Sequence, residues 1–224
     1  MVKWLKNEFW NGYNLFEKIF FTAMILLQVV VYCFVPDTVI GIVCGISGVV
    51  CVALTAKGKI SSYAFNFIQM ITYMIICWEA RLFLEFGEQI FYFIACILGV
   101  FVWNKHMVQN EDGTKQVKSR KFSLWQWVAM IVSTIIVTAL LGYFGDTVLH
   151  STLSYLDAFT VALALTAQLL MVFRYREQWL IWVVIDTASF IMFLILGQWS
   201  MVAMYIAWTI NALYGWYNWT KLCN

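Results

Sequence analysis

The sequence has little charge and almost no proline, and both shortages restrict what the protein can be. Charged residues make up 12% of the 224 positions and hydrophobic residues 63%, with one proline in the whole chain. Soluble domains are roughly one quarter charged and one half apolar, and a soluble fold could not bury this much apolar side chain. The composition therefore excludes a soluble enzyme, a disordered regulator and a nucleic-acid-binding protein, and it indicates a membrane protein.

Several chemical motifs are also missing. The chain has no glycine-rich phosphate loop of the Walker type, which excludes direct ATP hydrolysis. It has no His-Glu metal motif within an apolar run and no nucleophile elbow, so the sequence predicts neither an enzyme nor a bound metal or other cofactor. Its six cysteines have no metal-ligand or disulfide-framework spacing, which predicts free thiols.

Eight apolar segments are long enough to cross a bilayer as helices. A spanning helix needs about 20 mostly apolar residues to cross a hydrocarbon core of roughly 30 Å. By that measure the predicted spans are residues 19–36, 38–56, 60–78, 88–104, 123–143, 155–174, 178–196 and 199–219. Residues 1–16, which mix aromatic side chains with lysine and asparagine, predict a segment at the membrane surface. We therefore expect an all-α membrane protein.

The basic residues lie almost wholly on one side of these spans. When the loops are assigned alternately, 13 of the 14 Lys and Arg residues share the side of the N-terminus, and Arg81 lies on the other side. Cytoplasmic loops carry such an excess of Lys and Arg. The even number of spans keeps both termini together, so both are predicted to be cytoplasmic in a multi-pass plasma (inner) membrane protein.

A thin internal repeat relates the two halves of the chain. At an offset of 116 residues, positions near the ends of the fourth and eighth spans are identical: Gly99 with Gly215, Trp103 with Trp219, and Lys105 with Lys221. The same offset places Tyr63 on Trp179. Parallel repeats of this kind are a known transporter plan, with a ligand site near the middle of the membrane.

The repeat predicts two parallel three-helix units joined by one linking helix (3+1+3), with an extra helix at the N-terminus. The extra helix, together with the surface segment, takes residues 1–37, and the first unit takes 38–104. A cytoplasmic loop and the linking helix take 105–150, and the second unit takes 151–224. The predicted fold is thus one membrane unit of eight transmembrane helices.

Asp186 is the one carboxylate that lies deep in an apolar run, close to the middle of the seventh span. A charge at that depth is costly, so it indicates a functional site. Trp179 and Trp182 precede it at helical spacing and share its helix face. Two indoles and one carboxylate can hold a flat, cationic heteroaromatic ring. This face is therefore the first candidate for substrate binding.

Two further spans carry polar and aromatic stripes at similar depth, and the fourth span begins with another polar residue. The candidate substrate-binding residues at these places are Asn211, Tyr214, Asn218, Asn66, Gln69, Tyr73 and Gln89. Single amides in spans more often join helices than bind ligands, and tryptophans near span ends usually form an aromatic belt. Packing therefore stays an alternative for these residues, whereas Asp186 favours function.

The Trp179-Trp182-Asp186 pattern, together with the Asn-rich aromatic end of the last span, resembles the PnuC family of vitamin transporters. The resemblance covers about residues 38–220. It implies a fold related to SWEET sugar transporters, a trimeric assembly in membrane lipid, and uptake of nicotinamide riboside for NAD biosynthesis. It further implies facilitated diffusion, in which a cytosolic kinase phosphorylates the substrate and traps it inside.

The sequence leaves two kinds of alternative: other substrates, and a protein that is not a transporter. The family's relatives carry thiamine, riboflavin or deoxynucleosides, and its nicotinamide riboside carriers often have Asn where this chain has Asp186. Thiamine is also a cation, so charge does not separate it from nicotinamide riboside, whereas it counts against neutral riboflavin. The alternative from a different class is a membrane sensor or binding subunit that recognises the vitamin without moving it.

Overall fold

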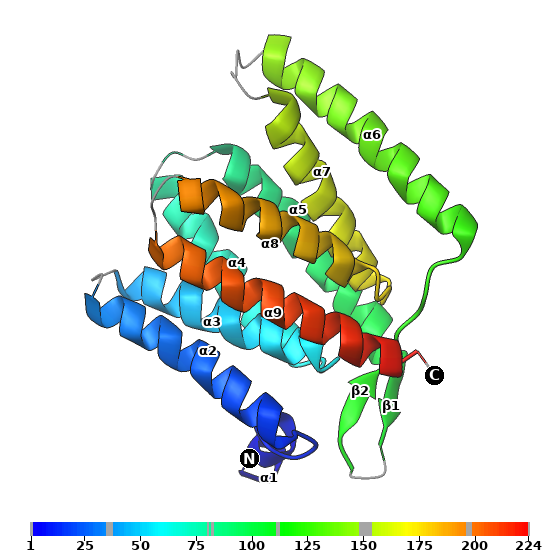
Figure 1. The fold of residues 1–224 in the computed structure, drawn as a ribbon. Coiled ribbons are helices and arrows are strands. Elements are labelled where there is room, and N and C mark those ends of the chain that lie inside the picture. Colours follow the sequence, from blue (N-terminus) through cyan, green and yellow to red (C-terminus); the bar gives the residue numbers. More distant parts are fainter. Residues whose placement is uncertain are drawn as a thin grey trace.

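A computed structural model describes residues 2–34, 38–79, 81, 83–110, 113–147, 154–195 and 199–223 of the chain. Within these residues the fold has nine helices and one short hairpin (Figure 1). The helices are α1 Val2–Phe9, α2 Leu15–Phe34, α3 Val39–Ala56, α4 Ser62–Glu79, α5 Phe83–Asn104, α6 Leu124–Thr147, α7 Ser154–Val172, α8 Gln178–Ile195 and α9 Trp199–Lys221. The hairpin pairs β1 Met107–Gln109 with β2 Lys115–Val117 in antiparallel register.

The prediction of an all-α membrane protein is confirmed, and each predicted apolar segment coincides with one of the helices α2 to α9. Four of the described helices are long and apolar enough to cross a membrane: α2, α3, the Phe86–Asn104 part of α5, and α6. The predicted division points at residues 37 and 150 lie outside the described residues. The six cysteines are free, as their spacing predicts.

Local polar motifs and backbone conformation set where several helices begin and end. α2 begins with a capping box, in which the Glu17 amide donates to Asn14 Oδ1 and the Asn14 amide donates to Glu17 Oε2, both at 2.8 Å. The chain leaves α3 through Gly58, whose φ of 67° is left-handed, and leaves α7 through Arg174, whose φ is 65°. A left-handed residue of this kind commonly ends a helix, so α3 and α7 end in the same backbone conformation.

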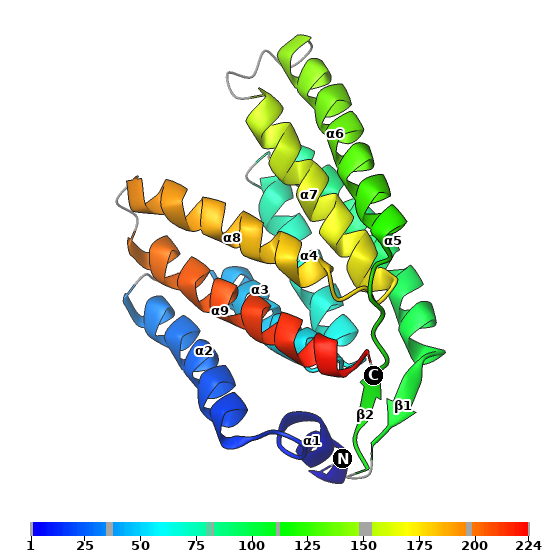
Figure 2. The same cartoon turned by 45° about the vertical axis from the view of Figure 1, so that its right-hand side comes forward.

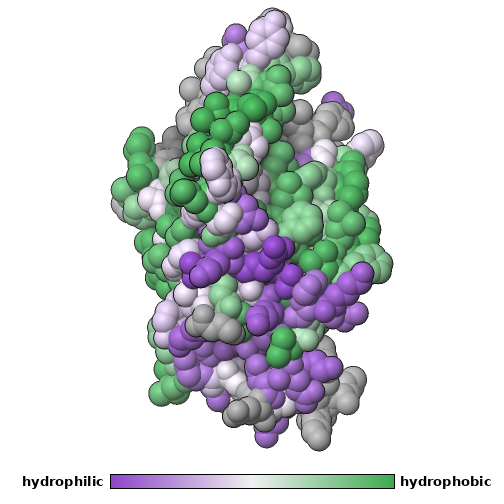
Figure 3. Space-filling view, turned by 90° about the vertical axis from the view of Figure 1, so that its right-hand side faces the viewer, coloured by the Kyte–Doolittle hydropathy of each residue, from purple (hydrophilic) through white to green (hydrophobic). Residues whose placement is uncertain are grey.

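The helices pack as a bundle in which α2 and α9 both lie along α3, and α8 lies between α7 and α9 (Figures 1 and 2). α6 packs on α7 at the outside of the bundle. α1, the hairpin and the C-terminus lie at one end of the molecule. Hydrophilic side chains gather over the lower half of the face that carries the hairpin, whereas the upper part is hydrophobic (Figure 3). An apolar belt next to a polar end suits a protein that lies in lipid.

The helix packing repeats at an offset of 116 residues. We name α3, α4 and α5 the first group and α7, α8 and α9 the second group. Successive helices pack together within each group, and α5 packs on α7 as α9 packs on α3. The turn after α3 has a hydrogen bond from the Gly58 amide to the Thr55 carbonyl at 2.9 Å, and the turn after α7 has one from Arg174 to Met171 at 3.0 Å.

Candidate functional site

Two tryptophans join the last turns of four helices, α3, α5, α7 and α9. The rings of Trp103 on α5 and Trp219 on α9 meet with 5.5 Å between their centroids, and both side chains are fully buried. Trp103 Nε1 donates to the Met171 carbonyl of α7 at 3.0 Å, and Trp219 Nε1 donates to the Thr55 carbonyl of α3 at 2.9 Å. Each indole thus finds its acceptor on the last turn of a helix in the other group, which satisfies a buried donor.

Trp179, a predicted site residue, packs against this tryptophan pair. Its ring lies edge to face with Trp219 at 6.0 Å between centroids, and it covers Gly215, where an added Cβ would overlap the indole. Tyr63 covers Gly99 in the same way. Trp179 is 4% exposed, and its Nε1 has no hydrogen-bond partner in the described part of the chain. In this arrangement Trp179 therefore fixes α8 against α9.

Trp182 and Asp186 follow on the same helix in different surroundings. Trp182 is half-buried and packs against the central cluster that contains Trp179. Asp186 is 5% exposed and lies near Tyr205 on α9. Among the described residues its carboxylate has no hydrogen-bond or ion-pair partner. A buried charge without a partner is costly, so a cationic ligand at this position would be stabilised.

Cys96 on α5 joins three helices through two amide side chains. Asn66 Nδ2 on α4 and Gln168 Nε2 on α7 lie 3.0 Å and 3.5 Å from its sulfur. Cys96 is fully buried and Gln168 is buried. Cys96 was not predicted as part of the site, because a single cysteine in an apolar run is typical of core packing. These contacts link the first group to the second.

The other predicted residues on the inner helices lie on α4, α5 and α9. Asn211 on α9 is 3% exposed, and its Oδ1 has no partner within the described residues. Gln69 on α4 lies against Gly48 of α3. Tyr73 on α4 is half-buried, and Gln89 near the start of α5 is buried. Asn211 thus has an acceptor that a ligand hydroxyl could use.

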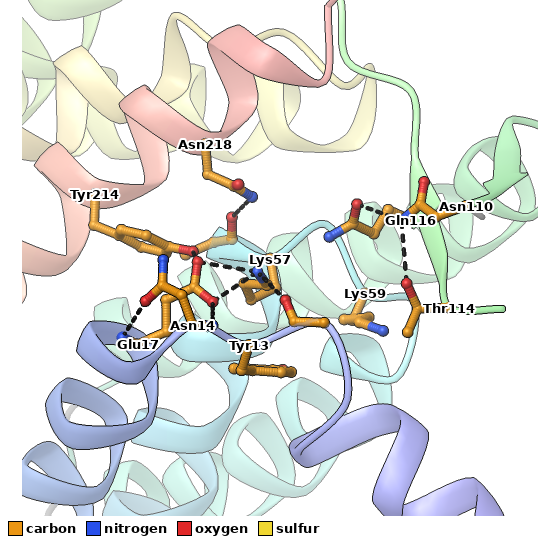
Figure 4. A network of polar contacts seen from close by, with 12 residues as sticks. Tyr13, Asn14, Glu17, Lys57, Lys59, Asn110, Thr114, Gln116, Tyr214 and Asn218 are labelled. Carbon is orange, nitrogen blue, oxygen red and sulfur yellow. Dashed lines mark hydrogen bonds and ion pairs between the residues drawn. The ribbon is translucent and has the colours of Figure 1, made fainter. Parts of the chain in front are cut away.

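Tyr214 and Asn218 make contacts with α2 and the end of α3 (Figure 4). The Tyr214 hydroxyl donates to Glu17 Oε1, and Asn218 Nδ2 donates to the Ala56 carbonyl at 2.8 Å. Glu17 forms a buried ion pair with Lys57, whose Nζ lies 3.1 Å and 3.0 Å from the two carboxylate oxygens. The sequence reasoning missed this pair. The Asn-x-x-Glu spacing at the start of α2 indicates the cap, but no local pattern indicates a partner 40 residues away.

Tyr13 covers the ion pair from the loop before α2. The Lys57 ammonium lies 4.9 Å from the centroid of the Tyr13 ring, a cation–π contact. The Tyr13 hydroxyl donates to the Glu8 backbone carbonyl at 2.9 Å. Burial, together with the charges of Glu8 and Glu17, raises the pKa of the Tyr13 phenol well above its ordinary value. Tyr13 therefore stays protonated as a donor at neutral pH.

Two hollows open on the end of the molecule beside α1. One, of about 140 Å³, is lined mostly by aromatic and aliphatic side chains of α1, α2 and α3. The other, of about 720 Å³, lies between α1, the turn before α4, the end of α5 and the hairpin. Neither is lined by Trp182 or Asp186. Within the described residues no cluster of His, Cys, Asp and Glu could hold a metal ion.

Known proteins resemble the chain over nearly its whole length. The model of the nicotinamide mononucleotide transporter family matches residues 38–221. The nicotinamide riboside transporter PnuC of Haemophilus influenzae is 36% identical over 97% of this chain and 95% of its own length. The protein of the same name from Neisseria mucosa is 31% identical over 99% of this chain and 87% of its own length.

A solved structure shares the fold as well. The crystal structure of the vitamin B3 transporter PnuC superimposes with a TM-score of 0.85, at 29% sequence identity, over 100% of this chain and 98% of that chain. The correspondence includes the residues before position 38, which the family model does not cover.

Proposed function

The chain belongs to the nicotinamide mononucleotide transporter family, and from this membership we propose that it carries nicotinamide riboside across the plasma (inner) membrane. Its relatives are named as transporters over lengths that include almost all of this chain. Its apolar helices suit a multi-pass membrane protein. The chain is accordingly proposed as a vitamin transporter in the supply of NAD precursors, and not as an enzyme.

One observation carries the proposed site: Asp186 is buried without a partner in the described part of the chain, one turn beyond Trp182. The pyridinium ring of nicotinamide riboside is flat and positively charged. An indole face and a carboxylate are suited to bind such a ring, because both attract a desolvated cation. We assign ring binding to Trp182 and charge balance to Asp186, with Trp179 holding α8 in position.

The ribose needs hydrogen-bonding groups, and the amides of the inner helices could supply them. We assign this role to Asn211, Asn66, Gln69 and Gln89, with Tyr73 beside them. Asn211 has a buried acceptor that no described residue uses. Tyr214 and Asn218 stay in the proposed site as residues at its edge toward α2 and α3, since both lie on α9 with Asn211.

For the architecture we propose eight spans, with the first and second groups as parallel repeats (38–104 and 151–224) joined by α6 and preceded by the extra helix α2. The contacts that recur at an offset of 116 residues support this plan. The excess of Lys and Arg on one side supports cytoplasmic termini. Rocking of the two groups would expose the site to each side in turn. Movement down the gradient, with trapping by a cytosolic kinase, would then need no further energy source.

Uptake into sealed vesicles tests this function. Vesicles that contain the protein and an enclosed nicotinamide riboside kinase with ATP should accumulate labelled phosphorylated product, and vesicles without kinase should only equilibrate. Binding without entry would identify a sensor or binding subunit instead. Preferential uptake of thiamine, offered in parallel, would change the substrate and leave the transporter class standing. Conversion of the label in kinase-free vesicles would indicate an enzyme.

A further inference from the structure

A buried polar network joins three helices at the end of the molecule beside α1 (Figure 4). Glu17 on α2 pairs with Lys57 at the end of α3 at 3.0 Å and accepts a hydrogen bond from the Tyr214 hydroxyl of α9. Lys57 also donates to the Gly12 carbonyl at 3.1 Å. Glu17 and Lys57 are each 5% exposed. We call Glu17, Lys57 and Tyr214 the Glu17 network.

The network covers a contact between α3 and α9 that closes this end of the bundle. Next to it, Asn218 Nδ2 donates to the Ala56 carbonyl at 2.8 Å, and Trp219 Nε1 donates to the Thr55 carbonyl at 2.9 Å. α3 belongs to the first group and α9 to the second. A movement that separates the groups at this end therefore has to break these bonds and, with them, either the Tyr214–Glu17 bond or the Glu17–Lys57 pair.

The network has no counterpart in the other half of the repeat. At the offset of 116 residues, Phe173 takes the place of Lys57 and Leu98 takes the place of Tyr214. Both replacements are apolar and exposed, with 47% of the surface of Phe173 and 52% of that of Leu98 accessible. The network is thus not part of the packing that the two groups share. It depends on α2, the extra helix that precedes the two groups.

A buried ion pair contributes little net stability, because the cost of removing two charges from water about cancels their attraction. Loss of one partner is nevertheless strongly unfavourable, since it leaves the other charge buried alone. Such a pair favours one defined arrangement of the helices that carry it. Here that arrangement holds α9 against α3, with the Tyr214 hydroxyl as the link to α2.

We propose that the Glu17 network is a latch, through which α2 holds the α3–α9 end closed and which opens when the two groups separate there. Tyr214 then acts as a positioning residue for α9 through Glu17. The inference rests on the proposed function, because transport requires the site to open to each side of the membrane in turn. The extra helix would thereby regulate how often this end opens.

Cys51 offers a native reporter of that opening, because it lies on α3 and is 6% exposed. In the reporter background Cys51 is the single cysteine, with serine at Cys96 and alanine at the other four positions. The rate at which a water-soluble maleimide alkylates Cys51, in protein reconstituted in vesicles, measures the open population. Nicotinamide riboside binding is measured separately on the same preparations.

Tyr214→Phe should raise the alkylation rate about tenfold, the scale of one lost hydrogen bond to a charged group. Tyr217→Phe is the matched control, since Tyr217 lies on the same helix with 58% of its surface exposed, and it should leave the rate unchanged. The double variant Glu17→Gln with Lys57→Met removes both charges, leaves no buried ion, and should also raise the rate.

Wild-type alkylation rates in both Tyr214→Phe and the double variant would overturn the latch. Weaker nicotinamide riboside binding in Tyr214→Phe at an unchanged alkylation rate would overturn it too, because Tyr214 would then act on the substrate without holding this end closed. Failure of the wild-type protein to bind nicotinamide riboside would count against the proposed function alone. The comparison of alkylation rates would still decide whether the latch exists.

Discussion

Trp103 and Trp219 stand 116 residues apart in the sequence, and their rings meet where α5 and α9 end, with 5.5 Å between centroids. Each indole donates its N–H to a helix of the other group. The two equivalent residues therefore join the halves of the chain through matching contacts. Substitutions at this tryptophan contact should weaken the whole bundle, whereas those at Asp186 should act mainly on binding.

Gly215→Ala should destabilise the protein, because an added Cβ would overlap the Trp179 ring. Overpacking of this kind costs about 1–3 kcal/mol, measurable as a lower thermal unfolding temperature in detergent. Gly87→Ala on α5 is the control, since beyond the backbone of its own helix no atom lies within 4 Å of the new Cβ there. Equal unfolding temperatures for the two variants would contradict the close packing of the Trp179 ring of α8 on Gly215 of α9.

Cys96→Ala should destabilise the protein more than Cys96→Ser. The alanine leaves the Asn66 and Gln168 amides without their shared acceptor, and an unsatisfied buried polar group costs about 1–3 kcal/mol. Serine keeps an acceptor at the same place. The two free energies of unfolding, compared in one detergent, check this, and identical values would mean that the amides do not depend on residue 96.

Trp182→Ala should weaken nicotinamide riboside binding by more than about 1 kcal/mol, the scale of a desolvated cation–π contact. Trp125→Ala is the control, because Trp125 lies on the outside of α6 with 80% of its surface exposed. Calorimetric titration of both variants gives the two affinities. Wild-type affinity in Trp182→Ala would assign this tryptophan to packing.

Asp186→Asn should lower affinity for cations in particular. The substitution removes a buried negative charge and nearly keeps the shape, so the loss comes from Coulomb attraction in a poorly solvated site. Affinity for nicotinamide riboside should fall about tenfold, which corresponds to about 1.4 kcal/mol. The reduced, uncharged form of the same nucleoside should lose much less. Equal losses for both forms would exclude charge balance as the role of Asp186.

The helices could be predicted from the sequence because long apolar runs have few alternatives in a membrane. The residues matched in the repeat also have matched surroundings, since Tyr63 covers Gly99 and Trp179 covers Gly215. Such matches survive because close packing at a glycine tolerates little change. A single charged residue in an apolar run, such as Asp186, can be picked out from the sequence because burying its charge in a membrane costs free energy.

The contacts between distant segments could not be predicted in this way. Helical spacing puts Asn211, Tyr214 and Asn218 on one face of α9, but Tyr214 and Asn218 reach Glu17 and the end of α3. The pairing of Glu17 with Lys57 depends on how α2 lies along α3, which no local pattern encodes.

The most direct test is a titration of the purified protein with nicotinamide riboside, thiamine and riboflavin, followed by intrinsic tryptophan fluorescence. A ring stacked on Trp182 should quench part of the emission of the 12 tryptophans. The proposed site predicts saturable quenching by nicotinamide riboside that is lost in Asp186→Ala. Absence of quenching by any of the three compounds, or quenching that Asp186→Ala leaves intact, would contradict it.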